Sequence, residues 1–253
     1  MEWQAPAIVL EARPHGEGGA VVSVLTERHG RHAGLAKGGT SRAQAGLWQP
    51  GNLVEVRWVG RLAEQLGALS GEMVHPTAAL ALDDPLALAL LNSACALAAE
   101  ALPEREPQPR VFSGLLTLMA HLGRGAAASV ADYIRWEALL LDALGYGLDL
   151  DACAVTGGAE DLAFVSPRSG RAVSAGAAGP YRDRLLPLPL FLRGGQDERD
   201  PAQWLAGLRL TGHFLARDAF GARHRPLPPA RQRLEARIAT LLPSGPPDDA
   251  PPG

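Results

Sequence analysis

Short apolar runs separated by glycine-containing turns fill residues 7–74, and this pattern predicts β-structure. The runs cover residues 8–10, 20–25, 33–36, 53–59 and 66–69. Residues 53–59 partly alternate between apolar and polar side chains, as a half-buried strand does. Turn signals recur at roughly 8- to 12-residue intervals, which is typical of a sandwich or a barrel. Because closure removes exposed strand edges, we predict a five-stranded barrel of the oligonucleotide-binding (OB) type.

Beyond Val74 the pattern changes to alanine- and leucine-rich stretches bounded by helix-terminating residues. Helices are predicted over residues 84–102, 111–122, 129–145, 200–219 and from 229 onward. Asp84 and Asp200 each precede a proline, and this pair is typical of a capping residue followed by the first helical position. Ser129, three residues before Asp132, resembles a capping box. The sequence therefore predicts an α+β fold in which a helical bundle follows the barrel.

The same texture changes divide the chain into predicted domains. We place the barrel at residues 1–76 and the helical domain at 77–242. Within the latter, residues 149–180 are rich in glycine, alanine and serine, and they predict a small irregular lobe with short strands at 164–165 and 172–173. Residues 243–253 have almost nothing to bury, and we expect a disordered tail.

Composition adds limits to this picture. With 253 residues, the chain is long enough to bury a core without cross-links, and its two cysteines, Cys95 and Cys153, form no disulfide framework. The first residues lack the pattern of a signal peptide, and the most apolar helix is too short and interrupted to span a bilayer. We expect a soluble, cytoplasmic protein with no membrane partner.

Charge is distributed unevenly along the chain. The net charge is −3, yet residues 13–61 hold seven basic residues against three acidic ones. Residues 209–237 likewise hold seven arginines against two acids, although for any one of these arginines a solvated helical face is the better interpretation. The barrel region is therefore locally basic, which favours a polyanion such as nucleic acid as its ligand.

Searches for catalytic chemistry give no support for an enzyme. The sequence contains no serine elbow, zinc-protease helix, phosphate loop or dinucleotide fingerprint. Lys37 precedes Gly38 and Gly39 instead of following them, so this segment predicts a turn carrying one cation. His29 and His32 have no partner at metal-ligand spacing, and an exposed turn is the better interpretation.

Few aromatic side chains are available for stacking on bases. Trp48 and Trp58 are the candidates in the barrel region, and Trp58 lies in a strand where core packing is the simpler interpretation. Phosphate contacts from arginine and lysine would then supply most of the affinity, with steep salt dependence.

Several short motifs along the chain resemble the RecO family of recombination mediators. They are Ala12-Arg13-Pro14, Thr26-Glu27, Gly30-Arg31, Lys37-Gly38, Gln49-Pro50-Gly51, Arg135-Trp136-Glu137, Leu144-Gly145-Tyr146-Gly147 and Cys153. The resemblance implies an N-terminal OB-fold barrel, a C-terminal helical domain and a role in DNA repair through the RecF pathway. Such proteins bind single- and double-stranded DNA and anneal complementary strands. With RecR, they help RecA to load onto DNA coated by single-strand-binding protein (SSB). The resemblance therefore also implies a cytoplasmic protein that is associated with the nucleoid.

The resemblance also implies functional residues. Basic positions of the family's barrel correspond to Arg13, Arg31, Lys37 and Arg42, with Arg57 as a lesser candidate for phosphate contact. Many relatives hold zinc in the lobe through two Cys-x-x-Cys pairs. Here only Cys153 remains of the first pair and no cysteine of the second, so we expect neither zinc nor another cofactor. We predict instead a lobe held by packing of Phe164, Val165 and Val173, with Cys153 as a small buried apolar residue.

Family members also capture the acidic, apolar-ended C-terminal tail of SSB in the helical domain. Such capture needs an apolar slot with a cation at its mouth. Our candidates for this slot are Phe112, Leu116, Arg135 and Leu139, and ordinary core packing of the three apolar side chains is an equally good interpretation.

Two alternatives remain open at this stage. A protein–protein interaction scaffold without direct DNA contact fits the low aromatic content and the negative net charge. A hydrolase would need scattered Ser, His and Asp residues to be assembled by the fold, because no local signature is present. Stoichiometry with RecR and any preference between single and double strands are not encoded in recognisable motifs.

Overall fold

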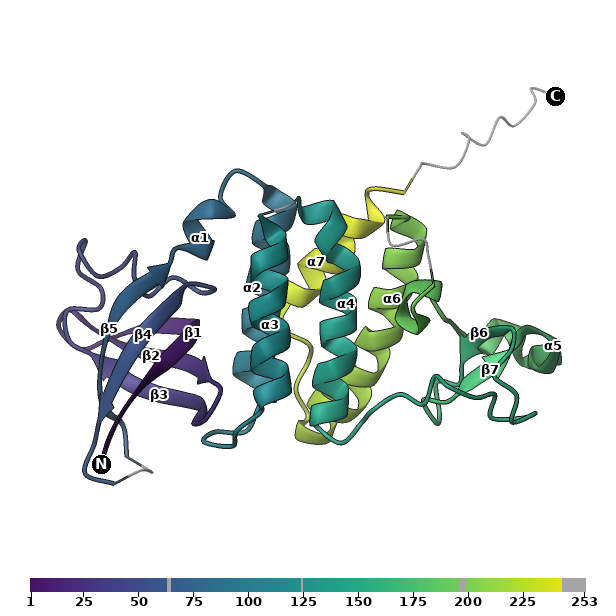
Figure 1. The fold of residues 1–253 in the computed structure, drawn as a ribbon, viewed down its shortest axis with the longest axis horizontal. Coiled ribbons are helices and arrows are strands. Elements are labelled where there is room, and N and C mark those ends of the chain that lie inside the picture. The colour runs from purple at the N-terminus through teal and green to yellow at the C-terminus, as the bar shows by residue number, and fades with distance from the viewer. Residues whose placement is uncertain (63–64, 124, 196–198, 243–253) are drawn as a thin grey trace.

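The computed structural model describes residues 1–62, 65–123, 125–195 and 199–242. Its N-terminal part contains five strands: β1 (Glu2–His15), β2 (Gly19–Thr26), β3 (Gly30–Ala36), β4 (Leu53–Val59) and β5 (Gly67–His75). They close into a barrel in the order β1-β2-β3-β5-β4, with β3 and β5 parallel and all other neighbours antiparallel (Figure 1). The predicted fold class, an OB-type barrel followed by helices, is confirmed.

Strand β1 is longer than the apolar run, residues 8–10, from which it was predicted. Its residues from Glu2 to Ile8 pair with β4, and its residues from Ala7 to His15 pair with β2, so only Ala7 and Ile8 have partners in both strands. Pro6 lies in the first half of this strand. Because β2 ends at the level of Ala7, the first half of β1 has a strand neighbour on one side only, and there a proline is tolerated.

The barrel and the helices share an apolar core. Side chains of one parity on β1 and β2 fill the barrel together with Trp48 and Trp58, whereas Ile8, Leu10 and Leu25 point outward and are fully or almost fully buried in the helical core. Core packing therefore crosses the predicted boundary at residue 76, and the predicted domain limits stay a prediction.

Helices form the middle of the molecule (Figure 1). They are α1 (Thr77–Leu80), α2 (Pro85–Ala101), α3 (Pro109–Leu122), α4 (Ala126–Ala143), α6 (Pro201–Phe214) and α7 (Pro229–Ala239). The Asp84 carboxylate accepts hydrogen bonds from the amides of Leu86 and Ala87 at 2.8 and 3.1 Å, and Asp200 caps α6 in the same way. Helix α6 continues as a π-helical turn (Leu215–Phe220) and a short 3-10 turn (Gly221–Arg223).

The predicted capping box at Ser129 is wrong. Helix α4 begins three residues earlier, at Ala126, and its N-cap is Gly125 with a φ of +115°, a conformation that glycine adopts readily. Ser129 lies inside the first turns, where its hydroxyl donates to the Gly125 carbonyl at 3.4 Å. A serine can thus bond backward within a helix as well as cap it, and the sequence spacing does not separate the two.

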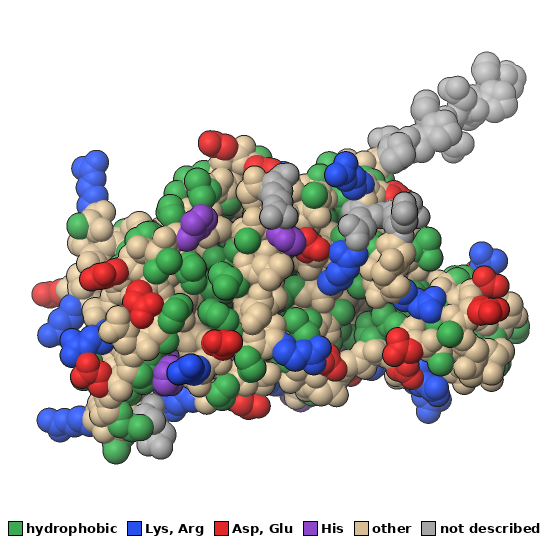
Figure 2. All heavy atoms as spheres, viewed as in Figure 1, with side chains coloured by type: hydrophobic (Ala, Val, Ile, Leu, Met, Phe, Trp, Pro, Cys, Tyr) green, Lys and Arg blue, Asp and Glu red, His purple; other side chains and the backbone are tan. Residues whose placement is uncertain are grey.

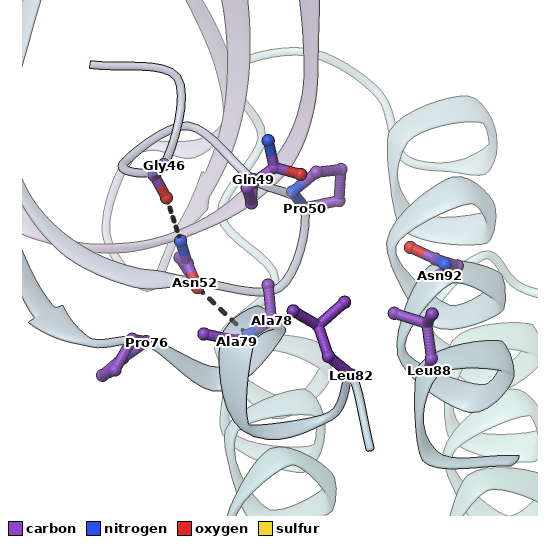
Figure 3. A pocket seen from close by; sticks show the side chains of 10 residues that line it. All are labelled: Gly46, Gln49, Pro50, Asn52, Pro76, Ala78, Ala79, Leu82, Leu88 and Asn92. Carbon is purple, nitrogen blue, oxygen red and sulfur yellow. Dashed lines mark hydrogen bonds between the residues drawn. The ribbon is translucent and has the colours of Figure 1, made fainter. Parts of the chain in front are cut away.

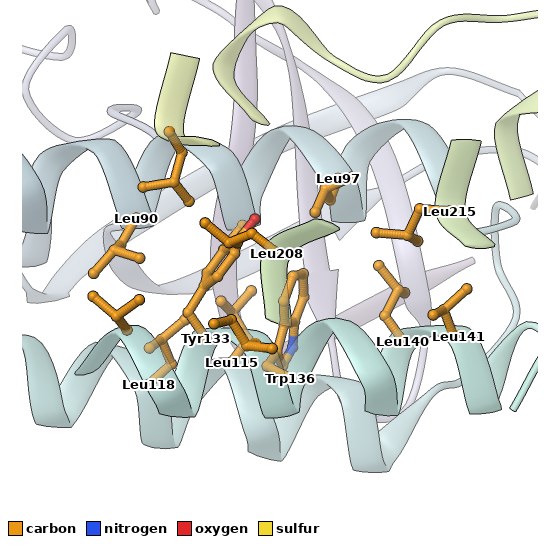
Figure 4. Packing of buried hydrophobic residues seen from close by; sticks show 14 of the residues in the cluster. Leu90, Leu97, Leu115, Leu118, Tyr133, Trp136, Leu140, Leu141, Leu208 and Leu215 are labelled. Carbon is orange, nitrogen blue, oxygen red and sulfur yellow. The ribbon is translucent and has the colours of Figure 1, made fainter. Parts of the chain in front are cut away.

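Leucines and aromatic side chains from α2, α3, α4 and α6 interdigitate at the centre of the bundle (Figure 4). A buried charge pair lies within this apolar packing: Arg231 of α7 and Glu137 of α4 both have fully buried side chains. The Arg231 Nη2 atom donates to Glu137 Oε2 at 3.2 Å, and Tyr133 donates to the same carboxylate at 2.6 Å. The Thr211 hydroxyl of α6 also donates to it, and Ser93 of α2 is bonded to Tyr133. This network joins four helices.

A small lobe lies at the end of the molecule opposite the barrel (Figure 1). It contains a three-stranded sheet in the order β7-β6-β8, formed by β6 (Leu162–Val165), β7 (Ala172–Ser174) and β8 (Leu186–Pro187). Helix α5 (Ala175–Ala178) and 3-10 turns at Gly179–Arg184 and Leu190–Arg193 complete it. The two strands predicted here are present, and the predicted tail at 243–253 lies outside the described residues. Across the described ranges, no helix is both long and apolar enough to cross a membrane.

Candidate nucleic-acid interface

The five cations predicted to contact phosphate lie in four different places on the barrel. Arg13 and Lys37 are on the outer surface of β1–β2–β3, Arg42 is in the loop between β3 and β4, Arg31 faces the helices, and Arg57 is on the β1–β4–β5 surface. Each position has a different electrostatic environment.

Arg13 and Lys37 share the outer surface of the barrel at the end beside the β1–β2 turn. Arg13 lies opposite Val21, and Val21 lies opposite Leu35, so the three side chains form one row across β1, β2 and β3. Lys37 continues the outward parity of Leu35 directly after β3. Arg13 is 72% exposed although its Nε contacts Glu11 at 2.5 Å. We call this surface, with Arg13, Val21, Leu35 and Lys37, the β1–β2–β3 face.

The loop between β3 and β4 extends this face. Residues 37–52 include Lys37 and Arg42 and no acidic residue. The loop is anchored to the β1–β2 turn by a hydrogen bond from the Thr40 amide to the Gly18 carbonyl at 3.3 Å. Lys37 and Arg42 are exposed. Three cations therefore gather at the end of the barrel where the β1–β2 turn and this loop meet.

The β1–β4–β5 face has the opposite character. Cross-strand pairing places Glu55 between Pro6 and Glu72, and Arg57 between Gln4 and Ser70. Arg57 donates to Glu2 at 2.6 Å. With Glu2, Glu55 and Glu72 against Arg57, this face carries a net negative charge, and Figure 2 shows acidic side chains over the barrel with basic ones toward its rim. Such a surface repels phosphate, so Arg57 is poorly placed for DNA contact.

Arg31 joins the barrel to the helical domain. Its Nε donates to the Leu102 carbonyl at 2.9 Å and its Nη1 lies 3.3 Å from Glu104. The side chain is only 19% exposed, and burial lowers the pKa of its guanidinium. The backbone of the same segment pairs as well, because the Arg105 amide donates to the Arg31 carbonyl at 2.8 Å. These contacts give Arg31 a structural role.

The two tryptophans considered for base stacking are both buried. Trp48 is 2% exposed and Trp58 is 1% exposed, and both belong to the barrel core. Another aromatic pair, Trp3 and His29, is half-buried at the barrel surface and stacked with ring centroids 4.2 Å apart. Sequence reasoning missed Trp3 because it precedes the apolar run, residues 8–10, from which the first strand was predicted.

Three of the four residues suggested for the SSB tail make contacts within the protein. Phe112 is 6% exposed, and Leu139 lies against the backbone of Gly114 on the neighbouring helix α3. Arg135 donates to the Phe191 carbonyl at 3.1 Å and pairs with Asp132 at 3.1 Å. Leu116 alone of the four is exposed. Their assignment to a partner stays a prediction.

A groove between the barrel and the helices offers the slot that those four residues lack. Its first part is a pocket of about 470 Å³, lined by Gly46, Gln49, Pro50, Asn52, Pro76, Ala78, Ala79, Leu82, Leu88 and Asn92 (Figure 3). Asn52 fixes the walls, since its side chain donates to the Gly46 carbonyl at 2.8 Å and accepts from the Ala78 amide at 3.1 Å.

Leu88 and Asn92 also line a second pocket of about 240 Å³, with Pro85, Ala89, Ala230, Arg233 and Arg237. We call the two together the α1–α7 groove. Leu82, at its apolar end, is 65% exposed, and Arg233 and Arg237, at its other end, are exposed cations. The groove is lined by three segments that are far apart in the sequence, at residues 46–52, 76–92 and 230–237, so no local motif could predict it.

The lobe has no cluster of ligands for a metal. Among the described residues, no group of three or more His, Cys, Asp or Glu side chains could hold a metal ion. Cys153 is 1% exposed, but it is bonded and not merely packed: its Sγ lies 3.5 Å from the Ser174 hydroxyl and accepts from the Ser174 amide at 3.3 Å. Hydrogen bonds from Ser174 and Thr156 lower the pKa of this thiol to about 6. Val165 and Val173 are buried as predicted, and Phe164 is half-buried beneath Arg182. The absence of a cofactor stays a prediction.

Comparison with known proteins identifies relatives along the whole chain. Residues 1–77 match the family model described as "Recombination protein O N terminal", and residues 82–226 match "Recombination protein O C terminal". The chain is 57% identical to a DNA repair protein RecO of Granulibacter bethesdensis, over 95% of this chain and 97% of that protein. It is 58% identical to a DNA repair protein RecO of Gluconacetobacter diazotrophicus, over 98% of this chain and all of the relative.

Proposed function

Because the chain belongs to the RecO family, whose members act in DNA repair and recombination, we propose that it binds single- and double-stranded DNA and anneals complementary strands. In the same proposal it acts with RecR to assist the loading of RecA onto SSB-coated DNA, as a mediator and not as an enzyme. The structural observation that carries the proposal is the difference between the two barrel faces.

DNA is proposed to lie on the β1–β2–β3 face, with Arg13, Lys37 and Arg42 as phosphate contacts. Strands 2 and 3 and the adjacent loops are the usual nucleic-acid surface of OB folds. Here this surface is bordered by Arg13 of β1, which is exposed although it contacts Glu11, and by the exposed Lys37 and Arg42. Arg31 and Arg57 are not among the proposed phosphate contacts. Arg31 is bonded to the helical domain, and Arg57 lies on a face that also carries three carboxylates.

Annealing requires no bond chemistry. Two strands repel each other through their phosphates, and a protein that neutralises part of both allows base pairing to drive the reaction. In the 209–237 cluster, Arg231 is buried, and the side chains of Arg217, Arg223 and Arg225 make contacts within the protein. Arg209, Arg233 and Arg237 are exposed on α6 and α7, and they are the proposed contacts for a second strand or an acidic partner.

The α1–α7 groove is our proposed docking site for the SSB tail. An acidic peptide with an apolar end could place that end beside Leu82 and Leu88, while Arg233 and Arg237 pair with its carboxylates. Arg233→Glu combined with Arg237→Glu should abolish binding of a fluorescent SSB-tail peptide and leave thermal stability unchanged. If peptide binding is lost in an Arg135→Glu variant and not in the Arg233→Glu/Arg237→Glu variant, the docking site is instead the one formed by Phe112, Leu116, Arg135 and Leu139.

The main test measures binding of labelled single- and double-stranded oligonucleotides by fluorescence anisotropy across a salt series. Arg13→Glu combined with Lys37→Glu should abolish binding at low salt. The matched control, Arg110→Glu with Arg171→Glu, makes the same charge change on helix α3 and the lobe and should retain binding. If both double variants bind as the wild type does, the barrel is not the contact surface, and a scaffold without DNA contact becomes the better account.

Annealing of complementary oligonucleotides coated with the cognate SSB then tests the mediator role. The wild-type protein should accelerate duplex formation, and the Arg13→Glu/Lys37→Glu variant should not. Acceleration by that variant would separate annealing from the barrel surface.

A further inference from the structure

Three aromatic rings form a column that runs from the barrel core to its surface. Trp58, Trp3 and His29 are stacked in that order, with centroids 6.0 Å apart for the tryptophans and 4.2 Å apart for Trp3 and His29. The interplanar angles are 11° and 15°, so the rings are nearly parallel. Trp58 is fully buried, whereas Trp3 and His29 are half-buried. The column therefore ends in an accessible ring, that of His29.

The inner end of the column is fixed by close backbone contacts. A Cβ on Gly60 or on Gly67 would lie 2.4 Å from the Trp58 ring, so only glycine fits beside it. The outer end is fixed by the β2–β3 turn, where the His29 amide donates to the Thr26 hydroxyl at 2.9 Å. Gly30 follows with a φ of +62°, and a Cβ there would lie 2.1 Å from the Glu106 carbonyl. The position of the His29 ring is thus set before any ligand arrives.

A polar ring with unused nitrogens borders the column. His32 packs edge-on against Trp3 and Trp58, at 5.1 and 4.9 Å between centroids. It is 5% exposed, and neither of its ring nitrogens has a hydrogen-bond partner among the described residues. Buried polar atoms without partners are rare in folded proteins, and this end of the barrel carries two on one side chain.

Positive charge accompanies the accessible ring. Arg28 precedes His29 in the turn and is exposed, and its charge acts on the imidazole. Arg105, from the segment that pairs with β3, is 34% exposed, lies 3.8 Å from Glu104, and its charge acts on His32. An aromatic face beside cations is the combination that binds single-stranded nucleic acid without sequence preference.

We propose that His29 stacks on an unpaired nucleobase of single-stranded DNA and that Arg28 contacts an adjacent phosphate. The proposal rests on the DNA-binding function proposed above, and it adds a base contact at the opposite end of β2 from Arg13. In a duplex the base is already stacked between its neighbours. The contact is therefore made with a single strand and lost on pairing, which favours release of the annealed product.

The test compares a short oligothymidylate with an abasic strand of equal length, which has the phosphates but no bases. His29→Ala should weaken binding of oligothymidylate roughly tenfold, since stacking contributes about 1–3 kcal/mol per base and 1.4 kcal/mol is tenfold. Binding of the abasic strand should not change. His29→Phe keeps an aromatic face and should restore the oligothymidylate affinity. His224→Asn, at an exposed histidine in the helical domain, is the control and should bind both strands normally.

The outcomes separate the two proposals. Wild-type protein that binds neither strand would overturn the DNA-binding function and the stacking contact with it. If the wild type binds both and His29→Ala changes neither, or weakens both equally, the stacking contact is wrong while DNA binding stands. Failure of His29→Phe to restore binding would also overturn it, because the role of the ring would then not be stacking.

Discussion

The barrel and the helical bundle treat buried polar groups in opposite ways. In the bundle, Arg231 and Glu137 are fully buried, and their charges are paired with each other and bonded to Tyr133 and Thr211. In the described part of the chain, four buried side-chain atoms lack a hydrogen-bond partner, and all four belong to the barrel: Ser23 Oγ, Trp48 Nε1 and both ring nitrogens of His32. The bundle is thus built for one arrangement of its helices, whereas the barrel retains polar capacity that water or a ligand can use.

Removal of one partner of the buried pair should cause the greatest loss of stability. Arg231→Leu should lower the free energy of unfolding by about 3–5 kcal/mol, because Glu137 would stay buried without its counter-charge. Urea unfolding followed by circular dichroism measures the loss.

Removing both charges should recover most of that stability. The double variant Arg231→Met with Glu137→Leu replaces the pair by apolar groups of similar length, and such replacements are often neutral or stabilising. A double variant as unstable as Arg231→Leu alone would show that the pair itself, and not the unpaired charge, sets the cost.

The next largest effect concerns His32 and pH. Burial, with a further contribution from Arg105, lowers the pKa of His32 from 6.5 to about 4. Between these values the unfolded chain binds a proton that the folded barrel does not, so stability is present above pH 6.5 and is lost as pH falls toward 4. The loss reaches about 3 kcal/mol, from 1.36 kcal/mol per pKa unit.

His32→Phe keeps the edge-on packing and removes the titration. The dependence of the unfolding free energy on pH should therefore be flatter in this variant than in the wild type between pH 4 and 6.5, as measured by urea unfolding at several pH values. Identical slopes in the two proteins would mean that His32 is protonated as easily in the folded barrel as in the unfolded chain.

A weaker effect is expected at one hydrogen-bonded side chain of the barrel, Thr26. The Thr26 hydroxyl is buried, accepts from the His29 amide and donates to the Gly30 carbonyl at 3.3 Å. Thr26→Val removes both hydrogen bonds and should cost about 1–2 kcal/mol, since one buried hydrogen bond contributes about 1 kcal/mol, and thermal unfolding measures the loss. No change in melting temperature would show that the turn is held by its contact with Glu106 instead.

Much of the fold was predictable because its signals are local. Asp84 before Pro85 correctly predicted the start of α2, and the alternation of apolar and polar side chains around Val56 correctly predicted β4. The capping box at Ser129 failed because a serine hydroxyl bonds to either side of a helix terminus with similar ease. The first half of β1 was not predicted. It contains Pro6, which a strand tolerates only where it has a neighbour on one side, and the sequence does not tell how many neighbours a strand has.

The candidate site was less predictable than the fold. Arg13 and Arg31 look alike in the sequence, and only the packing of the helices against β3 separates an exposed cation from a structural one. A signal for Arg231 was present: it lies three residues before Leu234 and seven before Ile238, and all three are buried on one side of α7. The α1–α7 groove had no such signal, because its walls come from the barrel loop, α1, α2 and α7.

The burial of Ile8, Leu10 and Leu25 in the helical core decides how the molecule can be divided. A fragment ending at Pro76 would present these three side chains to water as one apolar patch, at a cost of about 25 cal/mol for each Å² uncovered. Such a fragment would associate with itself or aggregate, so the barrel is not a portable module.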